Sequence, residues 1–142
     1  MIKQDLIEKL KNHYLSMIKE KNFDHFIDPQ LIHLDDGVAE IHWQAKPDHL
    51  NRFGSVHGGA LAGLIDTVAA ISSLTKMKRI VTIELNVSYI KAATIETKII
   101  AKGRVIQAGK SLLRTVVELY NEDQQLLTRG HLTFFVLGDL DL

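Results

Sequence analysis

The apolar residues of this chain follow two different rhythms. In residues 2–20 they recur about every four positions, and acidic residues lie among the lysines, which favours a helix packed on its own domain over one lying on a membrane. In residues 81–89 they alternate strictly with polar residues, which predicts a strand with one apolar face. The first rhythm is carried by Ile2, Leu6, Leu10, Tyr14 and Ile18, and the second by Val81, Ile83, Leu85, Val87 and Tyr89.

The rest of the chain predicts a second helix and more strands. Residues 31–34 and 38–43 predict a short hairpin, because Asp35-Asp36-Gly37 between them favours a turn. Residues 56–74 predict one long helix, and further long strands are expected at 95–107, 111–120 and 125–137. We predict an α+β fold in which the four long strands form a meander and the antiparallel sheet wraps around the long helix.

Length, charge and composition narrow the possible functions. The 142 residues suit a single domain spanning 1–142, and 17 basic residues balance 17 acidic ones, so nothing indicates a nucleic-acid partner. The absence of cysteine excludes disulfides, a thiol nucleophile and thiolate metal sites. Residues 1–5 lack the uninterrupted apolar core expected of a signal peptide, and no apolar run approaches the roughly 20 residues that span a bilayer. We expect a soluble cytoplasmic protein without a membrane partner.

The glycine-rich start of the long helix is the first candidate site. Gly58 and Gly59 stand where the first N–H groups of a helix lack internal partners and carry the positive end of its dipole. With no side chains to block them, these groups can bind a carbonyl oxygen or an anion. For the glycines alone, a turn that serves only chain geometry is an equal alternative. The polar loop with Asn51 upstream and the carboxylate of Asp66 downstream favour a site.

Asp66 is the second candidate. It lies among apolar residues in the middle of the helix, where aspartate has a poor propensity and a charge is costly to bury. Such a carboxylate can act as a general base or as a nucleophile, and an aspartate at the solvent edge of the helix is an equally weighted alternative. Small and polar residues share its face and leave room for a partner backbone or a ligand: Gly59, Gly63, Asp66, Thr67, Ala70 and Ser73.

Gly58 and Asp66 are too far apart to act on one substrate from the same chain. At about 1.5 Å per helical residue they are separated by roughly 12 Å, whereas contacts with a reacting carbonyl need about 3 Å. If both groups act on one carbonyl, they come from different chains. A shared site therefore predicts a homodimer.

Other kinds of chemistry find little support. The seven histidines form no His-x-x-His pair and no HExxH pattern, so we predict neither a metal nor a cofactor. The chain has no Gly-x-Ser-x-Gly elbow, no Walker loop and no dinucleotide fingerprint. Basic residues in the late strand region suit phosphate binding, although solvated strand edges explain them equally well: Lys102, Arg104, Lys110, Arg129 and His131.

One motif runs from the polar loop into the long helix. It reads Asn51-Arg52-Phe53-Gly54-Ser55-Val56-His57-Gly58-Gly59 and continues to Ala62-Gly63-Leu64-Ile65-Asp66. It resembles the hotdog-fold acyl-CoA thioesterases, specifically the PaaI-like branch of phenylacetic acid degradation. The resemblance extends through residues 82–89 and Gly109-Lys110 and covers most of residues 30–138. The loop, the His-Gly-Gly and the aspartate are fairly specific, whereas the strand part alone is not.

The resemblance implies a fold, a reaction and an assembly. The fold would be a hotdog, an antiparallel sheet wrapped around one long central helix, here with an extra N-terminal helix. The protein would form a homodimer, which in the family often assembles further into a homotetramer. Its substrates would be acyl-CoA thioesters, hydrolysed to the free acid and CoA without a metal.

The family motif also implies a role for each site residue. Asp66 would act as a base on water or as a nucleophile, and the Gly58 amide of the opposite subunit would polarise the thioester carbonyl. Asn51 and His57 would arrange the helix mouth, and Thr82 would help to position water. The residues expected to contact the substrate are Phe53, Gly59, Arg104, Gly109 and Lys110.

The sequence departs from the family at one point and leaves two questions open. Many members have a proline about three residues beyond the tyrosine of the motif strand, whereas Tyr89 is followed here by Ile90-Lys91-Ala92-Ala93, which would loosen the strand exit. The preferred acyl group, whether short, medium or aromatic, is also open. It depends on which of a few residues line the pocket: Phe53, Leu61, Ile65, Met77 and Tyr89.

Two alternative functions remain on the same fold. The first is a non-catalytic acyl-CoA binding or sensor protein, although the chain lacks the helix-turn-helix region and the net basic charge of a DNA-binding sensor. The second is a hotdog dehydratase, which ranks lower because such enzymes typically use a histidine with a differently placed acidic residue.

Overall fold

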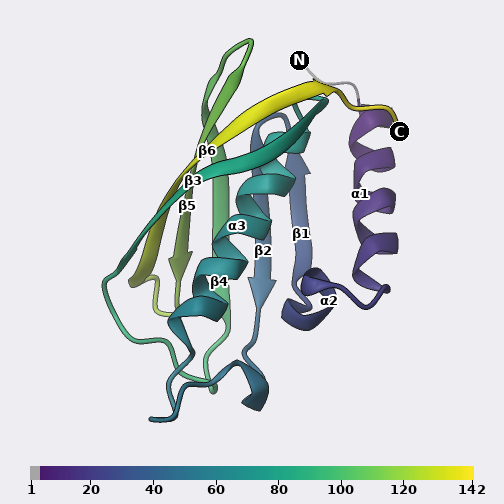
Figure 1. Ribbon diagram of the computed structural model, residues 1–142. Helices are drawn as coiled ribbons and strands as arrows, with labels where there is room; N and C mark the ends of the chain where they lie inside the picture. Colours follow the sequence, from purple (N-terminus) through teal and green to yellow (C-terminus); the bar gives the residue numbers. More distant parts are fainter. Residues whose placement is uncertain (1–3) are drawn as a thin grey trace.

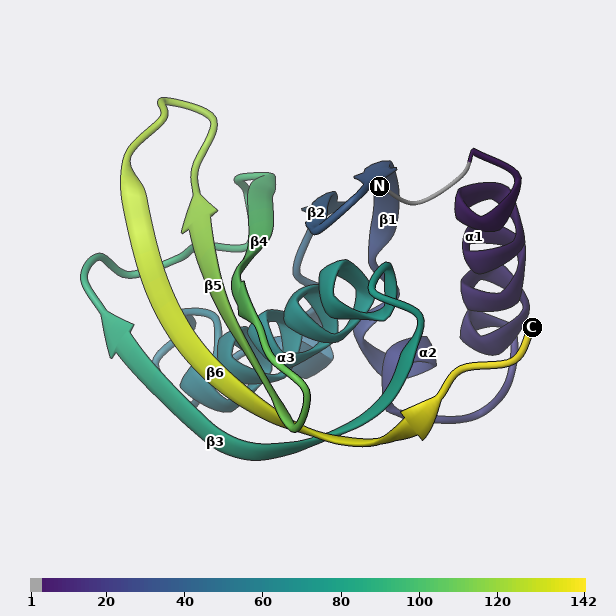
Figure 2. The same ribbon diagram turned by 90° about the horizontal axis from the view of Figure 1, so that it is seen from above.

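The computed structural model describes residues 4–142, in which a six-stranded antiparallel sheet curls around one long helix (Figures 1 and 2). The elements are α1 (Gln4–Ile18), α2 (Phe23–Ile27), β1 (Gln30–Asp35), β2 (Val38–Trp43), the short 3-10 helix η1 (Pro47–His49), α3 (Gly58–Leu74), β3 (Lys78–Tyr89), β4 (Ile99–Ala108), β5 (Leu112–Tyr120) and β6 (Leu126–Asp139). This arrangement confirms the predicted α+β fold with its sheet wrapped around a central helix. The predicted start of the first helix, at residues 2 and 3, lies outside the described residues. No helix within residues 4–142 is both long and apolar enough to cross a membrane.

The strand order is β1-β2-β4-β5-β6-β3, which corrects one part of the prediction. The predicted meander holds for β4, β5 and β6 only, and a meander of all four long strands is wrong. β3 instead pairs antiparallel with β6 along its whole length and forms the sheet edge farthest from β1. The reason is that α3 carries the chain from β2 across the concave face to the far edge of the sheet, where β3 forms. The chain then returns, and β4 pairs with β2.

β3 contains a bulge that strict alternation did not predict. Thr82 pairs with Phe134 and Glu84 pairs with Thr133, which leaves Ile83 as an extra residue. The prediction of an alternation without interruption is therefore wrong at this point. Because the bulge shifts the faces by one residue, Thr82 joins the face that looks toward α3. The other β3 residues on that face are Ile80, Leu85, Val87 and Tyr89.

The core lies between α3 and the concave face of the sheet. Leu64, Ile65 and Val68 of α3 are fully buried, as the apolar side of the predicted helix requires. Two sheet glycines allow this close approach, because a Cβ on Gly103 would lie 2.9 Å from Val68 and one on Gly130 would lie 2.5 Å from Ile65.

The short helix α2 covers part of the α3 face that was predicted to be open. A side chain on Gly63 would overlap the ring of Phe23, and the Thr67 hydroxyl donates a hydrogen bond to Asp24 at 3.0 Å. Ser73 points into the core and shares a hydrogen bond with a hydroxyl of β5. The prediction that this whole face is free is therefore wrong, because a helix absent from the prediction packs on it.

Candidate active site

α3 begins at Gly58, with His57 as its N-cap residue. The His57 ring accepts a hydrogen bond at Nδ1 from the Gly59 N–H at 2.7 Å, so the Gly59 amide is already engaged. Because Nδ1 is the acceptor, the proton of the neutral ring lies on Nε2. Within residues 4–142 no acceptor engages the Gly58 N–H. Of the two glycines in the motif, Gly58 is therefore the one whose amide is open to a ligand.

Tyr89, at the end of β3, closes over the start of α3. Its hydroxyl donates a hydrogen bond to the Gly58 carbonyl at 2.6 Å, and a Cβ on Gly58 would lie 3.3 Å from the tyrosine ring. From the sequence, Tyr89 belongs to the motif strand and is among the residues that could line the pocket. In the structure it also ties the edge strand to the helix N-terminus.

Asn51 organises the loop that precedes α3. Its side-chain oxygen accepts hydrogen bonds from the backbone N–H groups of Phe53 at 2.9 Å and Ser55 at 3.1 Å, which holds the loop in a tight turn. Asn51 and Gly58 together line a cleft of about 360 Å³. Phe53, in contrast, is 86 % exposed in this loop and does not line the cleft.

The segment after β3 forms another part of this cleft, and its backbone is firmly tied. The N–H groups of Ile90 and Lys91 both donate to the Leu127 carbonyl, at 2.8 Å and 3.0 Å, and the Val56 N–H donates to the Ala93 carbonyl at 3.0 Å. The expectation that the strand exit is loose without the family's proline is therefore wrong. Hydrogen bonds to β6 and to the loop before α3 hold it in place.

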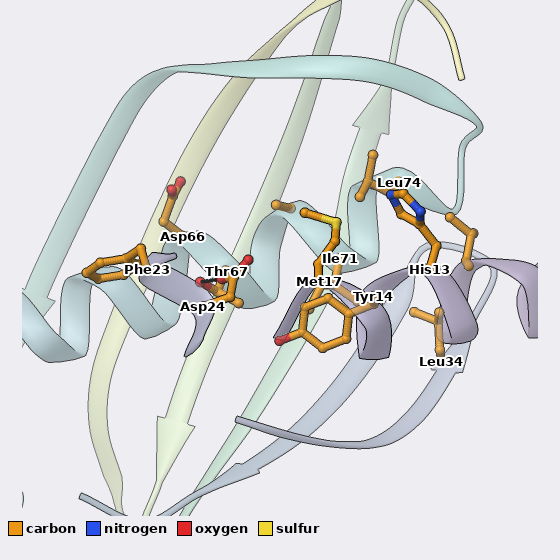
Figure 3. Close-up of a pocket in the computed structure, with 12 residues that line it drawn as sticks. His13, Tyr14, Met17, Phe23, Asp24, Leu34, Asp66, Thr67, Ile71 and Leu74 are labelled. Atoms are coloured by element: carbon orange, nitrogen blue, oxygen red, sulfur yellow. Dashed lines mark hydrogen bonds between the residues drawn. The ribbon is translucent and has the colours of Figure 1, made fainter. Parts of the chain in front are cut away.

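Asp66 lies half-buried about two turns beyond Gly58 on α3. The Thr82 hydroxyl donates to Asp66 Oδ1 at 2.8 Å, a contact that depends on the bulge in β3. One carboxylate oxygen thus has a defined partner, and acceptor capacity remains for a ligand. Asp66 lines a second cavity of about 300 Å³, enclosed by α1, α2, α3 and β1 (Figure 3).

The two candidate groups face different cavities. No residue that lines the cleft at Gly58 also lines the cavity at Asp66. With roughly 12 Å between them at about 1.5 Å per helical residue, one chain cannot place both groups on one carbonyl. None of the residues considered for pocket depth lines the Asp66 cavity, and only Leu61 and Tyr89 line the Gly58 cleft.

Sequence reasoning missed the part of the Asp66 cavity that comes from α1 and α2. Tyr14 of α1 forms one wall, and burial, followed by the charges of Asp24 and Asp28, holds the pKa of its hydroxyl well above the ordinary value. The apolar residues at every fourth position of the first helix predicted that this helix packs on the domain. They did not show which surface of the domain it packs against. Within residues 4–142 no cluster of three or more histidine, aspartate or glutamate side chains is placed to hold a metal ion.

Three residues expected to contact substrate lie apart from both cavities. Arg104 follows Gly103, which faces α3, so Arg104 points to the outer face of β4. Gly109 and Lys110 lie in the hairpin after β4, where the Gly109 N–H donates to the Leu112 carbonyl at 2.8 Å. Within one chain the structure does not bring these three residues to Gly58 or Asp66.

The chain matches known proteins along most of its length. The family model described as "Thioesterase superfamily" matches residues 53–128. Human "Acyl-coenzyme A thioesterase 13" is 25% identical over 132 residues, which cover 90% of this chain and 94% of that protein. A protein of Archaeoglobus fulgidus named "Putative esterase" is 26% identical over 137 residues, which cover 96% of this chain and 87% of that protein.

Solved structures show the same fold. Zebra fish thioesterase superfamily member 2 has a TM-score of 0.86 at 23% identity, covering 92% of this chain and 97% of its own. The E. coli PaaI protein of the phenylacetic acid degradation operon has a TM-score of 0.85 at 20% identity, covering 95% and 98%. The smu.793 protein of Streptococcus mutans, solved bound to acetyl CoA, has a TM-score of 0.78 at 21% identity, covering 80% and 91%. These likenesses confirm the hotdog fold and the recognised resemblance to PaaI-like proteins.

Proposed function

The chain belongs to the thioesterase superfamily, and from that premise we propose that it hydrolyses an acyl-CoA thioester to the free acid and CoA. The name of the human relative, acyl-coenzyme A thioesterase 13, supports this substrate class. The observation that carries the proposal is the 2.8 Å hydrogen bond that holds the Asp66 carboxylate at the edge of an apolar cavity. In this proposal residues 1–142 act as one hotdog domain.

Asp66 acts as the general base of the proposed reaction. Its carboxylate takes a proton from a water molecule while the water oxygen bonds to the thioester carbon. The Gly58 N–H of the opposite subunit donates a hydrogen bond to the carbonyl oxygen, which becomes negatively charged as the bond forms. When the carbon–sulfur bond breaks, the sulfur leaves with the bonding electrons and receives the proton from Asp66. The free acid and CoA leave, and the carboxylate is restored.

A second copy of this chain completes the site along the free edge of β3. Within residues 4–142, β3 has a neighbouring strand only on its β6 side. Its apolar side chains Val81, Ile83 and Leu85 are 45 %, 57 % and 39 % exposed. An exposed apolar edge strand is a template for pairing with another strand. Edge pairing of two β3 strands joins their free backbone N–H and C=O groups and makes one continuous sheet.

The contacts between β3 and α3 support one register for the proposed pairing. Thr82 binds Asp66 and Tyr89 binds Gly58, near opposite ends of the exposed stretch. When two β3 strands pair antiparallel about a two-fold axis just beyond Leu85, Thr82 of one chain lies opposite Tyr89 of the other. Asp66 of one chain then approaches Gly58 of the other. The dimer has two equivalent sites, each built from both chains.

Asp66→Asn tests the reaction, because it keeps the shape of the side chain and removes its basicity. We expect kcat to fall by about 10²–10⁴-fold on a panel of short, medium and aromatic acyl-CoAs. The matched control is Asp48→Asn, the same change at an exposed carboxylate outside both cavities. Full activity of Asp66→Asn on every acyl-CoA that the wild type hydrolyses would refute the mechanism.

A single turnover in heavy-oxygen water distinguishes a base from a nucleophile. If Asp66 activates water, the label enters the product acid in the first turnover and the protein stays unlabelled. If Asp66 attacks the thioester itself, an anhydride forms, and water that attacks its Asp66 carbonyl places the label on Asp66, whereas water that attacks the acyl carbon places it in the acid. Label in the peptide that contains Asp66, detected by mass spectrometry, would therefore establish the nucleophilic route, and we expect no label there.

A further inference from the structure

The cavity at Asp66 is long and mostly apolar. Its volume of about 300 Å³ lies at the lower end of the range of roughly 300–1,000 Å³ that is typical of ligand pockets. Figure 3 shows Asp66 and Phe23 at one end, and His13, Leu34 and Leu74 at the other. The remaining residues that line the cavity are Leu10, Tyr14, Met17, Asp24, Thr67, Ala70 and Ile71.

The cavity exists because α1 lies beside α3 and does not pack directly on it (Figure 2). Leu10 and Tyr14 of α1 are buried, and both line the cavity. On the opposite wall, Ala70 follows Asp66 by about one helical turn and presents only a methyl group. The small side chain of Ala70 therefore leaves space between Asp66 and the apolar residues of α1 that line the cavity.

Tyr14, which lines the cavity, has an unusual hydroxyl group. It is buried and has no hydrogen-bond partner among residues 4–142. Most buried polar groups in folded proteins are hydrogen-bonded, because an unpaired one loses its contacts with water without replacement.

We propose that this cavity binds the acyl group of the substrate and that α1 determines how large an acyl group fits. The inference rests on the proposed function, because it places the thioester carbonyl at Asp66. From there the hydrocarbon passes Ala70 and ends near Ile71 and Leu74. The apolar lining selects an apolar acyl group larger than acetyl, of medium chain length or aromatic. The acyl group thus lies within the chain that supplies Asp66, while the partner's cleft at Gly58 accepts the CoA side.

Ala70→Leu tests the inference by filling the path one turn beyond Asp66. Leucine is a good helix former, so we expect the fold to be retained. One methylene group too many or too few in a hydrophobic pocket changes kcat/KM by about 10–200-fold. We therefore expect kcat/KM for octanoyl-CoA to fall at least tenfold in Ala70→Leu. The acetyl group of acetyl-CoA is too short to reach Ala70. The kcat/KM of Ala70→Leu for acetyl-CoA should therefore change by less than about twofold. An equal effect on both substrates, or no effect on either, would overturn the inference.

Met17→Ala is the opposite change, because it enlarges the cavity from the α1 side. We expect the preference to shift from octanoyl-CoA toward dodecanoyl-CoA. The matched control is Leu15→Ala, which shortens an exposed apolar residue of α1 that does not line the cavity. An unchanged chain-length preference in Met17→Ala, or an equal shift in Leu15→Ala, would count against the inference.

A binding measurement separates this inference from the proposed function. If the wild type hydrolyses none of the acyl-CoAs, the proposed function is wrong. In that case calorimetry can still compare the affinity of the wild type for octanoyl-CoA with the affinity of Ala70→Leu. Weaker binding by Ala70→Leu supports the cavity as the acyl site, and equal binding overturns it.

Discussion

Replacing Gly58 with proline would remove one N–H donor and keep the helix that carries it. Proline suits the first position of a helix, because the N–H there has no helical partner and its ring holds φ near about −65°. His57, the preceding residue, already has φ −62 and ψ 135, an extended conformation that a following proline favours. The added Cβ would lie 3.3 Å from the ring of Tyr89. Gly58→Ala, which adds the Cβ and retains the N–H, is therefore the matched control.

The expected loss follows from the role of the donor. Removing one oxyanion donor typically lowers kcat by about 10²–10³-fold. The kcat of Gly58→Pro should therefore fall by that factor, and the kcat of Gly58→Ala by much less. In a dimer of Gly58→Pro with Asp66→Asn, one site contains both wild-type groups and the other contains neither. Random exchange of equal amounts places half of the dimers in this class, so the mixture should recover about a quarter of the wild-type rate.

Recovery is measured after the two inactive variants are mixed and their subunits exchanged. Because the chain has no cysteine, a thiol reagent in the assay detects only the CoA that is released. A rise from near zero to about a quarter of the wild-type rate supports a site built from two chains. If exchange is demonstrated with differently tagged subunits and the activity stays at the level of the separate variants, the two-chain site is refuted.

Three further substitutions test the structure around the site. Thr82→Val removes the hydroxyl that donates a hydrogen bond to Asp66. Because hydrogen bonds to charged groups contribute about 1.5–3 kcal/mol, kcat should fall about 10–100-fold with little change in KM. An unchanged kcat would show that Thr82 has no part in the mechanism. Gly130→Ala forces a methyl group against Ile65 and should lower the unfolding free energy by about 1–3 kcal/mol, measured as a lower denaturant midpoint; an equal midpoint would contradict the packing. Tyr14→Phe removes an unpartnered buried hydroxyl and should raise the unfolding free energy at neutral pH by up to about 1–3 kcal/mol. Because burial raises the pKa of Tyr14, the folded state keeps a proton that the unfolded state loses above about pH 10. The free energy of unfolding of the wild type should therefore fall as the pH rises above this value. Tyr14→Phe should show a smaller fall in alkaline denaturation curves.

Most elements of the fold were predictable because their apolar periods are long and regular. The first helix, the short hairpin, the long helix and the four long strands all lie close to their predicted positions. α2 was missed because five residues are too few to show a period. Asn22 was a possible signal, since asparagine is a preferred helix cap and its side chain accepts a hydrogen bond from the His25 N–H at 3.0 Å.

The residue types of the candidate site were predictable, and its division between two chains stays a prediction. Gly58 and Asp66 stood out because glycine and aspartate are costly within an apolar helix, and the constant rise of a helix was enough to show that one carbonyl cannot reach both. Which glycine amide is available was not predictable. That depends on the His57 ring, which engages the Gly59 N–H and leaves the Gly58 N–H open.

The sequence by itself therefore determined the elements and singled out Gly58 and Asp66 of α3, and the helical rise between them is the basis of the proposed two-chain site. Only the tertiary structure decided that β3 lies at the sheet edge, that a bulge turns Thr82 toward Asp66, and that α1 encloses the cavity beside that carboxylate. The physical reason is that periodicity and propensity describe residues a few positions apart. Strand order, bulges and cavities arise from contacts between segments far apart in the chain, and these depend on which surfaces meet when the chain folds.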